Sequence, residues 1–275
     1  MIKANTVKKI LLIPVVLFAL FYMVGVYFMQ TDDRIVEPRN AQQTISKTIA
    51  LFGGSGTTGD GILKASLASS EIEHIYVVTR RITPRMEEGA ASGKVTLIKH
   101  MDYLDYGPII NNLSDVDTVY WAIGISSIGV DEKTYGMIHT DFPMAFVQTW
   151  SETNSAQERS FHFISSSDIS EDSDTMWIRE KIRAEKALFG FAENYPLKVI
   201  AYRPDYIGPT EEEAHLGQDM LYWFFAPVGA AVRAQQIGQA MIEVTARIDD
   251  FSNGDKLSTS NIIRHSNAYD ALTSP

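Results

Sequence analysis

Three glycines, Gly53, Gly56 and Gly59, stand three residues apart directly after a short apolar run at 48–52. Apolar residues at helical spacing follow them, so the segment predicts a strand, a glycine turn and a helix. A turn without side chains lets the backbone approach a pyrophosphate, and the free N–H groups of the helix N-terminus attract its charge. A glycine-rich turn without a ligand is the alternative. The residues expected to bind dinucleotide phosphates are Gly53, Gly56, Thr57, Thr58 and Gly59.

Two arginines, Arg80 and Arg81, follow the second predicted strand at 75–79. An acidic residue at about this distance from a glycine turn binds the ribose hydroxyls of NAD. A guanidinium instead matches a 2′-phosphate in charge and geometry, and one charge-assisted hydrogen bond contributes about 1.5–3 kcal/mol. The pair therefore favours NADP over NAD as the cofactor, unless both arginines are simply solvated.

Apolar runs alternate with helical patterns along the rest of the chain. The further predicted strands are 95–99, 116–122, 161–164 and 197–202, and the predicted helices are 136–153 and 175–191. Such alternation gives a parallel sheet with helices on both faces. We expect an α/β fold, a Rossmann-type doubly wound parallel sheet with a small C-terminal substrate lobe, preceded by one N-terminal transmembrane helix.

Five motifs within 47–209 form a set. They are the Gly53, Gly56 and Gly59 turn, the pair Asp102 and Asp105, the sequence Ala122-Ile123-Gly124, the serines Ser165, Ser166 and Ser167, and Arg203-Pro204. With these motifs the segment resembles the short-chain dehydrogenase/reductase superfamily, in its atypical or extended, epimerase-like branch. The resemblance implies that Asp102 reaches the adenine and that Ala122 and Gly124 line the cofactor groove. It also implies that the three serines stand beside the nicotinamide.

The helix after the fifth strand departs from the family at one position. In the family a tyrosine gives or takes the carbonyl proton, and a lysine four residues on holds the ribose and lowers the tyrosine pKa. This sequence has Trp177 and Lys181 at that spacing, and an indole N–H is no acid near neutral pH. The candidate catalytic residues are Lys181, Ser166, Ser167 and Trp177, and Lys181 also belongs to the expected cofactor site.

Either the protein does not perform that chemistry or another group replaces the missing tyrosine. The candidate replacements are Ser166, Ser167, Asp168, Tyr135 and Tyr206. Trp177 itself has two interpretations: its flat ring could stack on a nicotinamide or a flat substrate, or it could pack in the core.

The segment 10–29 contains twenty residues without a charge. At about 1.5 Å per residue, a helix of this length spans roughly 30 Å, the thickness of the hydrocarbon core of a bilayer. A cleaved signal peptide is the alternative, but the apolar run is long and no small-x-small cleavage site follows it. We therefore predict a single-pass N-terminal anchor in the lipid bilayer.

The orientation of this anchor rests on two opposing arguments. Three lysines precede the span and two arginines follow it closely, which weakly favours placing the domain outside the cytoplasm. A dinucleotide-binding domain needs the cytoplasmic cofactor pool. We expect the soluble domain in the cytoplasm, and cleavage of the domain by protease added to intact cells would contradict this.

Composition excludes several classes of partner. The chain has 24 basic and 34 acidic residues, a net charge of −10, so it would repel phosphate backbones and we expect no binding to nucleic acid. Cysteine is absent, which excludes disulfides and thiolate metal sites. No two of the six histidines stand three or four residues apart, and we expect no bound metal.

The predicted domain organisation has four parts. They are a membrane anchor at 1–30, a polar linker at 31–46, an NAD(P)-binding Rossmann domain at 47–209, and a small C-terminal lobe at 210–275 that completes the same globule. Within the lobe, 210–213 predicts a capping box at a helix start, 234–246 an amphipathic helix and 262–263 a short strand. The aromatic segment 216–228 could close over a substrate, contact the bilayer or pack as a core helix.

Two functions remain in competition. The first is a membrane-anchored NADP(H)-dependent oxidoreductase or epimerase acting on a small or lipophilic carbonyl substrate. The second is a non-catalytic NAD(P)-binding redox sensor or assembly factor that has lost the catalytic tyrosine. A purely structural role would leave the phosphate-binding turn without a purpose.

Overall fold

A seven-stranded parallel sheet forms the centre of the computed structural model, which describes residues 4–32, 34–37, 39, 47–153, 158–167 and 169–273, with side chains from residue 13 on. The strands lie in the order β3-β2-β1-β4-β5-β6-β9. They are β1 Thr48–Phe52, β2 His74–Thr79, β3 Val95–Lys99, β4 Thr118–Trp121, β5 Arg159–Ile164, β6 Leu197–Arg203 and β9 Lys256–Ser258. The expected α/β fold with a parallel sheet is confirmed.

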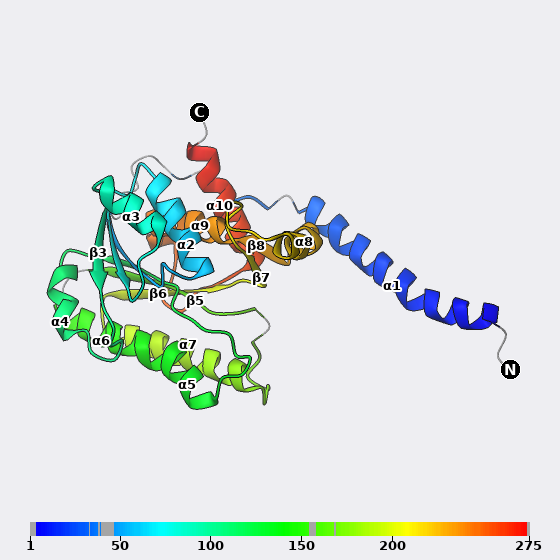
Figure 1. The fold of residues 1–275 in the computed structure, drawn as a ribbon, viewed down its shortest axis with the longest axis horizontal. Helices are drawn as coiled ribbons and strands as arrows, with labels where there is room; N and C mark the ends of the chain where they lie inside the picture. Colours follow the sequence, from blue (N-terminus) through cyan, green and yellow to red (C-terminus); the bar gives the residue numbers. More distant parts are fainter. Residues whose placement is uncertain are drawn as a thin grey trace.

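Helices cover both faces of the sheet (Figure 1). On one face lie α2 Thr57–Ala68, α3 Pro84–Ala91, α9 Ala234–Ala246 and α10 Thr259–Thr273; on the other lie α4 Gly107–Ile110, α5 Glu132–Gly136, α6 Phe142–Thr153 and α7 Met176–Ala192. The chain changes direction between β1 and β4, whose carboxyl ends therefore border a crevice. In open α/β sheets ligands bind in such a crevice.

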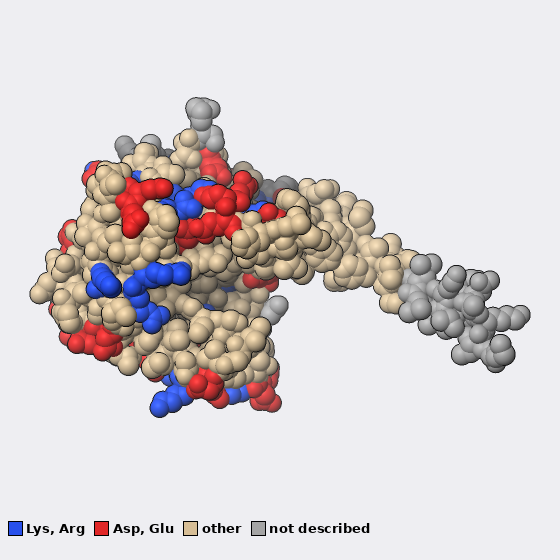
Figure 2. Space-filling view, viewed as in Figure 1, with Lys and Arg blue, Asp and Glu red and all other residues tan. Residues whose placement is uncertain are grey.

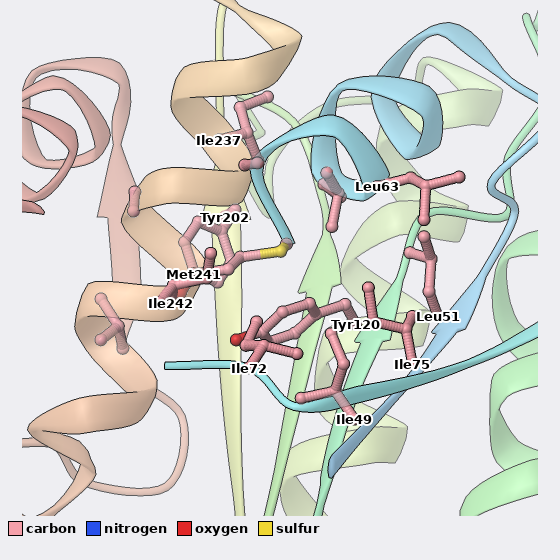
Figure 3. Close-up of a cluster of buried hydrophobic side chains, with 14 of the residues drawn as sticks. Ile49, Leu51, Leu63, Ile72, Ile75, Tyr120, Tyr202, Ile237, Met241 and Ile242 are labelled. Carbon is pink, nitrogen blue, oxygen red and sulfur yellow. The ribbon is translucent and has the colours of Figure 1, made fainter. Parts of the chain in front are cut away.

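Each face of the sheet has its own apolar core. Successive residues of β1 point to opposite faces, so Ile49 and Leu51 pack under α2 and α9, and Ala50 and Phe52 pack under α6. Figure 3 shows the first of these cores, in which Met241 of α9 reaches the sheet between fully buried neighbours. Burying one such side chain contributes about 1.5–3 kcal/mol.

A chain of hydrogen-bonded polar groups runs across β4, β5 and β6 on the face of the sheet that belongs to the first core. The Tyr120 hydroxyl lies 3.0 Å from Oγ1 of Thr245, which lies 3.2 Å from Nε2 of His162, whose Nδ1 lies 3.0 Å from the Tyr202 hydroxyl. Thr245 donates its one proton to the Met241 carbonyl at 2.8 Å. Thr245 must therefore accept from both Tyr120 and His162, which places the imidazole proton on Nε2.

The N-terminal helix α1, Ala4–Gln30, projects from the globule. Its segment Ile13–Gln30 has a mean hydropathy of 1.9 and is long and apolar enough to cross a membrane. Figure 2 shows the described part of this projection as a surface without Lys, Arg, Asp or Glu. No residue of this span is buried in the globule.

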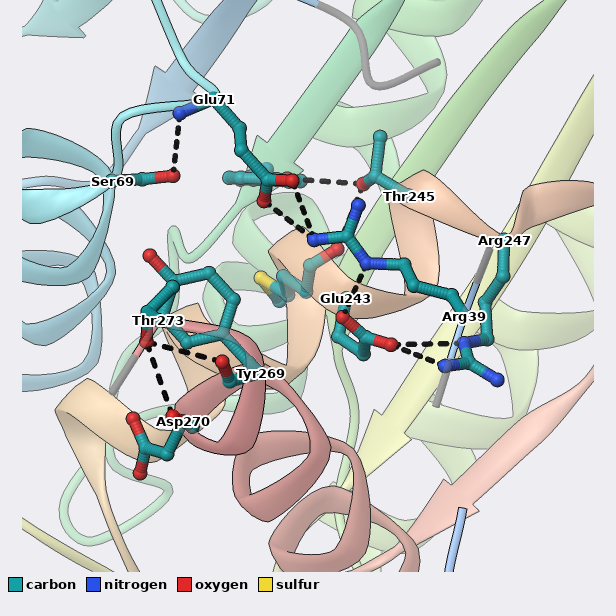
Figure 4. A network of polar contacts seen from close by, with 11 residues as sticks. Arg39, Ser69, Glu71, Glu243, Thr245, Arg247, Tyr269, Asp270 and Thr273 are labelled. Carbon is teal, nitrogen blue, oxygen red and sulfur yellow. Dashed lines mark hydrogen bonds and ion pairs between the residues drawn. The ribbon is translucent and has the colours of Figure 1, made fainter. Parts of the chain in front are cut away.

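The described part of the linker lies against the domain (Figure 4). Arg39 donates to Glu243 of α9 at 2.9 Å and to Glu71 at 2.6 Å, and its side chain is only 5% exposed. Arg247 completes the group by bonding both Glu243 and the carbonyl of Glu37. Removing one partner of a buried ion pair leaves an uncompensated charge, which typically costs about 3–5 kcal/mol. The contact therefore fixes the linker to the domain.

The chain after 209 differs from two expectations. No helix begins at 210–213: residues 211–213 form a turn, and α8, Leu216–Phe225, begins after His215, which exchanges capping bonds with Gln218. Glu212 instead pairs with Lys64 of α2 and Arg85 of α3. The predicted strand at 262–263 is wrong as well, because these isoleucines lie in α10 and face the core. The segment also contributes β8 Ala231–Arg233, which pairs with β7 Tyr206–Gly208 just before it, and the 3-10 helix η3 Ala226–Val228.

The buried imidazole of His162 predicts a loss of stability in acid. Burial lowers the pKa of His162 from 6.5 to about 3. Below pH 6.5 the unfolded chain binds a proton that the folded protein excludes, so stability is complete above pH 6.5 and falls towards pH 3. We expect this group to lower the free energy of unfolding by about 2 kcal/mol between pH 7 and pH 5. Chemical denaturation at both pH values measures it, and an equal loss in His162→Asn would contradict it.

Candidate functional site

A cavity of about 250 Å³ opens beyond the carboxyl ends of β1, β4 and β5. It joins the glycine turn to the start of α7. Its lining consists of Gly56, Thr57, Thr58, Ala122, Ile123, Gly124, Ile125, Tyr135, His139, Ile164, Ser165, Ser166, Trp177 and Lys181. Most of the residues predicted from the sequence for phosphate binding and catalysis are thus brought to one place.

The glycine turn holds its shape through backbone contacts that side chains would prevent. Gly53 has a φ of +82°, and a Cβ there would stand 2.5 Å from the carbonyl carbon of Ala122. A Cβ on Gly59 would stand 2.1 Å from the Gly53 oxygen. At Gly56, by contrast, the nearest atom to a Cβ is 3.5 Å away, and this residue lines the cavity. Two of the glycines therefore serve packing, and Gly56 leaves open space where α2 begins.

A second cavity, of about 140 Å³, adjoins the first at Gly56 and Gly124. Its far wall consists of Thr79, Arg80 and Tyr103, and the guanidinium of Arg80 lies 5.3 Å from the centre of the Tyr103 ring. A cation over an aromatic face is a favourable arrangement that also offers a flat surface. Asp102 is exposed and accepts from the backbone N–H of Leu104 at 3.0 Å, so Tyr103 lines this cavity and Asp102 does not.

Arg81 faces a third cavity on the other side of the turn, of about 380 Å³. Its guanidinium donates to the Ser55 carbonyl at 2.9 Å, which leaves other donors of the fork exposed to solvent. Arg80 and Arg81 thus stand on the two sides of the glycine turn. Both guanidinium groups are cationic and exposed, so either can bind a phosphate beside the turn.

Lys181 is the buried cation of the first cavity. It is 7% exposed, and its ammonium donates to the Ile164 carbonyl at 3.1 Å. Burial lowers its pKa to about 8, against an opposing effect of Glu185. Ser165 donates to Glu185 at 2.6 Å, and Arg203 pairs with the same carboxylate, so Ser165 is already engaged.

Trp177 lies one helical turn before Lys181 and lines the same cavity. The side chain is half-buried, with its ring at the cavity rather than in either apolar core. Among the other candidates, Ser166 lines the cavity, whereas the backbone of Ser167 donates to Pro204 and its side chain is not in the lining. Asp168 lies outside the described residues.

Two tyrosines were candidates to replace the missing hydroxyl. Tyr206 lies on β7, donates to the Gln218 carbonyl at 3.3 Å and stands apart from the cavity. Tyr135 lines the cavity. Burial, with the nearby carboxylate of Glu180, raises its pKa to about 12, so it keeps its proton and is a weak acid near neutral pH.

Sequence reasoning missed His139, which lies beside Tyr135 with 4.1 Å between ring centres. It belongs to η2, Met137–Asp141, a π-helical turn between α5 and α6. Such turns often occur at functional sites. Nε2 of His139 lies 3.2 Å from the carbonyl of Ile125, and burial together with Lys181 lowers its pKa to about 3. The imidazole is therefore neutral and braces the loop after β4.

No group of three histidine, aspartate or glutamate side chains that could hold a metal occurs among the residues whose placement is described. The absence of a metal stays a prediction from the sequence.

Comparison with known proteins identifies the fold. The sequence matches no family model and no curated protein. A solved 3-oxoacyl-[acyl-carrier protein] reductase from Brucella melitensis is similar, with a TM-score of 0.62 and 16% identity over 79% of this chain and 97% of that one. The protein has the short-chain dehydrogenase/reductase fold.

Two further structures agree. A 3-oxoacyl-[acyl-carrier protein] reductase from Brucella melitensis in complex with NAD has a TM-score of 0.61 and 16% identity over 80% of this chain and 98% of that one. A short chain dehydrogenase/reductase from Saccharomyces cerevisiae has a TM-score of 0.61 and 14% identity over 78% and 96%. At these identities the similarity shows the short-chain dehydrogenase/reductase fold, and the activity has to be argued from the site.

The contrast between two glycines of the turn gives a test of the site. In Gly59→Ala the new methyl group meets the Gly53 oxygen, so we expect a melting temperature lower by several degrees. In Gly56→Ala the methyl group stands 3.5 Å from the Gly53 oxygen, an ordinary contact distance, so the free energy of unfolding should fall by less than about 1 kcal/mol. Its affinity for NADPH should nevertheless fall at least about ten-fold, since the methyl group lies where the pyrophosphate would approach. Thermal unfolding and calorimetry measure both, and unchanged NADPH affinity in Gly56→Ala would contradict the assignment.

Proposed function

We propose that this protein is a membrane-anchored, NADP(H)-binding oxidoreductase of the short-chain dehydrogenase/reductase superfamily, in its atypical, epimerase-like branch. Its substrate is a small or lipophilic carbonyl compound, and the domain faces the cytoplasm. The observation that carries the proposal is the cavity in which Gly56 and Thr57 of the glycine turn meet Lys181, Ser166 and Trp177.

The residues present fit a dinucleotide. Gly56 leaves open the space beside the N-terminus of α2, where N–H groups and the helix dipole favour a pyrophosphate. The cavity at Arg80 and Tyr103 suits an adenosine, and the arginines on either side of the turn suit a 2′-phosphate. When bound, the cofactor would supply a hydride. Ala122 and Gly124 would lie along its middle, since they line both neighbouring cavities.

The proton of the reaction has to come from a side chain of the cavity or from the substrate. His139 is neutral and Tyr135 is a weak acid, whereas Lys181, with a pKa of about 8, is protonated at neutral pH and can release its proton. An acid with a pKa near the operating pH is the most effective one. We assign Lys181 as the proton donor and Ser166 as a hydrogen-bonding partner of the substrate oxygen.

The alternative is a non-catalytic NAD(P)-binding redox sensor or assembly factor. Trp177 favours it, because an indole at the cavity can stack on a flat ring without supplying a proton. The two functions share the cofactor site and differ only in turnover.

Calorimetric titration of the full chain in detergent micelles with NADPH and NADH tests the cofactor assignment. We expect micromolar binding of NADPH and binding at least about ten-fold weaker for NADH, a difference of about 1.4 kcal/mol or more. The double variant Arg80→Ala/Arg81→Ala should bind the two cofactors within about three-fold of each other. Arg183→Ala, which removes an exposed arginine of α7, is the matched control and should keep the preference. No binding of either cofactor would refute the proposal, and equal binding would refute the preference for NADP.

Restoring a hydroxyl at Trp177 tests whether the site lacks only its usual acid. We expect Trp177→Tyr to raise the rate of NADPH oxidation with simple aldehydes and ketones at least about ten-fold, because a hydroxyl at the position of the family's tyrosine would be a better placed acid than Lys181, and general acid catalysis typically contributes 10²–10⁴-fold. Trp177→Phe, an aromatic residue without the hydroxyl, is the matched control and should show no gain. Wild type that binds NADPH but never oxidises it would favour the sensor, and no gain in Trp177→Tyr would point to a reshaped pocket.

A further inference from the structure

The helix α8 with η3 presents an apolar surface to the outside of the globule. None of its described residues is buried. Five large apolar side chains on it are exposed by 43–74%: Leu216, Met220, Leu221, Trp223 and Phe224. Its only charged residue, Asp219, pairs with Arg233 at 2.7 Å and both side chains are mostly covered. A soluble surface would need polar groups here, so this face needs an apolar environment.

The surface is continuous with α1. Phe224 stacks on Phe18 with ring centres 6.1 Å apart and on Tyr22 at 5.4 Å, and the Tyr22 hydroxyl donates to the Phe224 carbonyl at 2.9 Å. Farther along, a Cβ on Gly25 would stand 3.1 Å from Val228, so the backbone of α1 approaches η3 closely. The two helices therefore share one apolar boundary.

The position of these contacts along α1 indicates how far below the membrane surface Phe224 would lie. Tyr22 precedes Gln30 by eight residues and Phe18 by twelve, which correspond to about 12 Å and 18 Å of helix. If α1 crosses a bilayer with Gln30 at its surface, Phe224 lies well below the headgroups. Figure 1 shows α8 beside the end of α1 that meets the globule, so the exposed face of α8 would lie in the same half of the bilayer as that end.

We propose that α8 and η3 are embedded in the same leaflet as the C-terminal half of α1. Their exposed apolar side chains contact the acyl chains of the lipid bilayer. The apolar side chains of such a face reach below the headgroups, and an indole such as Trp223 suits the boundary between headgroups and acyl chains. The inference rests on the proposed anchoring by α1. It assigns the aromatic segment to the bilayer rather than to a core or to a lid over the substrate.

Quenching of Trp223 by brominated lipids tests the proposal. The full chain is reconstituted in phosphatidylcholine vesicles with bromine on the acyl chains, and each sample is first floated to show that it binds the membrane. The bromines should remove roughly a quarter of the emission, since Trp223 is one of four tryptophans. The quenched part of the emission should disappear in Trp223→Phe and persist in the control Trp177→Phe. The side chain of Trp223 is 61% exposed, so its replacement by phenylalanine should be tolerated. Iodide in the water should not reach it.

The outcomes separate this inference from the anchoring. A chain that does not float with vesicles overturns both. A chain that floats, but whose wild type and Trp223→Phe variant are quenched equally by bromolipid, keeps the anchor and overturns the embedded α8. Quenching of Trp223 by iodide likewise overturns the embedded α8 and keeps the anchor. If neither quencher reaches Trp223, protein covers α8, from the same chain or from a second copy, and the embedded α8 is overturned as well.

Discussion

The close passage of the glycine turn against the end of β4 is the constraint on which the site depends. Gly53 and Ala122 approach so closely that no side chain fits between them, and Gly59 lies under the same turn. This contact brings the N-terminus of α2 and the loop after β4 to the same height, so that both border the cavity. A second close contact continues it, since Gly61 of α2 faces Ala234 of α9 with no room for a Cβ. The cavity is therefore held by backbone rather than by side chains that could rearrange.

Charged side chains stabilise the opposite wall of the cavity. Glu185 accepts from Ser165 and Arg203, and its negative charge partly offsets the cost of burying Lys181. A buried ammonium is costly, and groups with strongly shifted pKa values concentrate at functional sites. The helix α7 carries Trp177, Lys181 and Glu185 one turn apart, so a single face of one helix supplies the ring, the cation and its counter-charge.

The sequence predicted the parts of this arrangement that depend on local pattern. The strands, the glycine turn and the spacing of Trp177 and Lys181 each lie within a few residues, and short-range periodicity is enough to find them. The signals for Tyr103 and His139 are not local. Tyr103 lines the second cavity, while the adjacent Asp102 points outward and accepts from the backbone N–H of Leu104. His139 lines the first cavity because the π-helical turn between α5 and α6 shifts the register of the helix.

Long-range partners account for the predictions that failed. The acids at 210–213 resemble a helix cap, but Glu212 pairs with Lys64 and Arg85, which stand far away in the sequence. The two isoleucines at 262–263 have the β-branched character of a strand, yet burial against the first core places them in α10. Propensity is a weak preference that tertiary packing overrides.

The ion pairs of Arg39 limit how far the domain can move from α1. A free linker of sixteen residues would let the domain wander about 20 Å from the end of α1 and turn in any direction. Arg39 is bonded to Glu243 and Glu71, and Asp32, two residues after α1, pairs with Arg264 of α10, so the domain is held close to the end of α1. On the proposed anchoring and the proposed lipophilic substrate, the mouth of the cavity would keep a nearly constant height above the lipid, and cavity and substrate would meet by lateral diffusion in two dimensions.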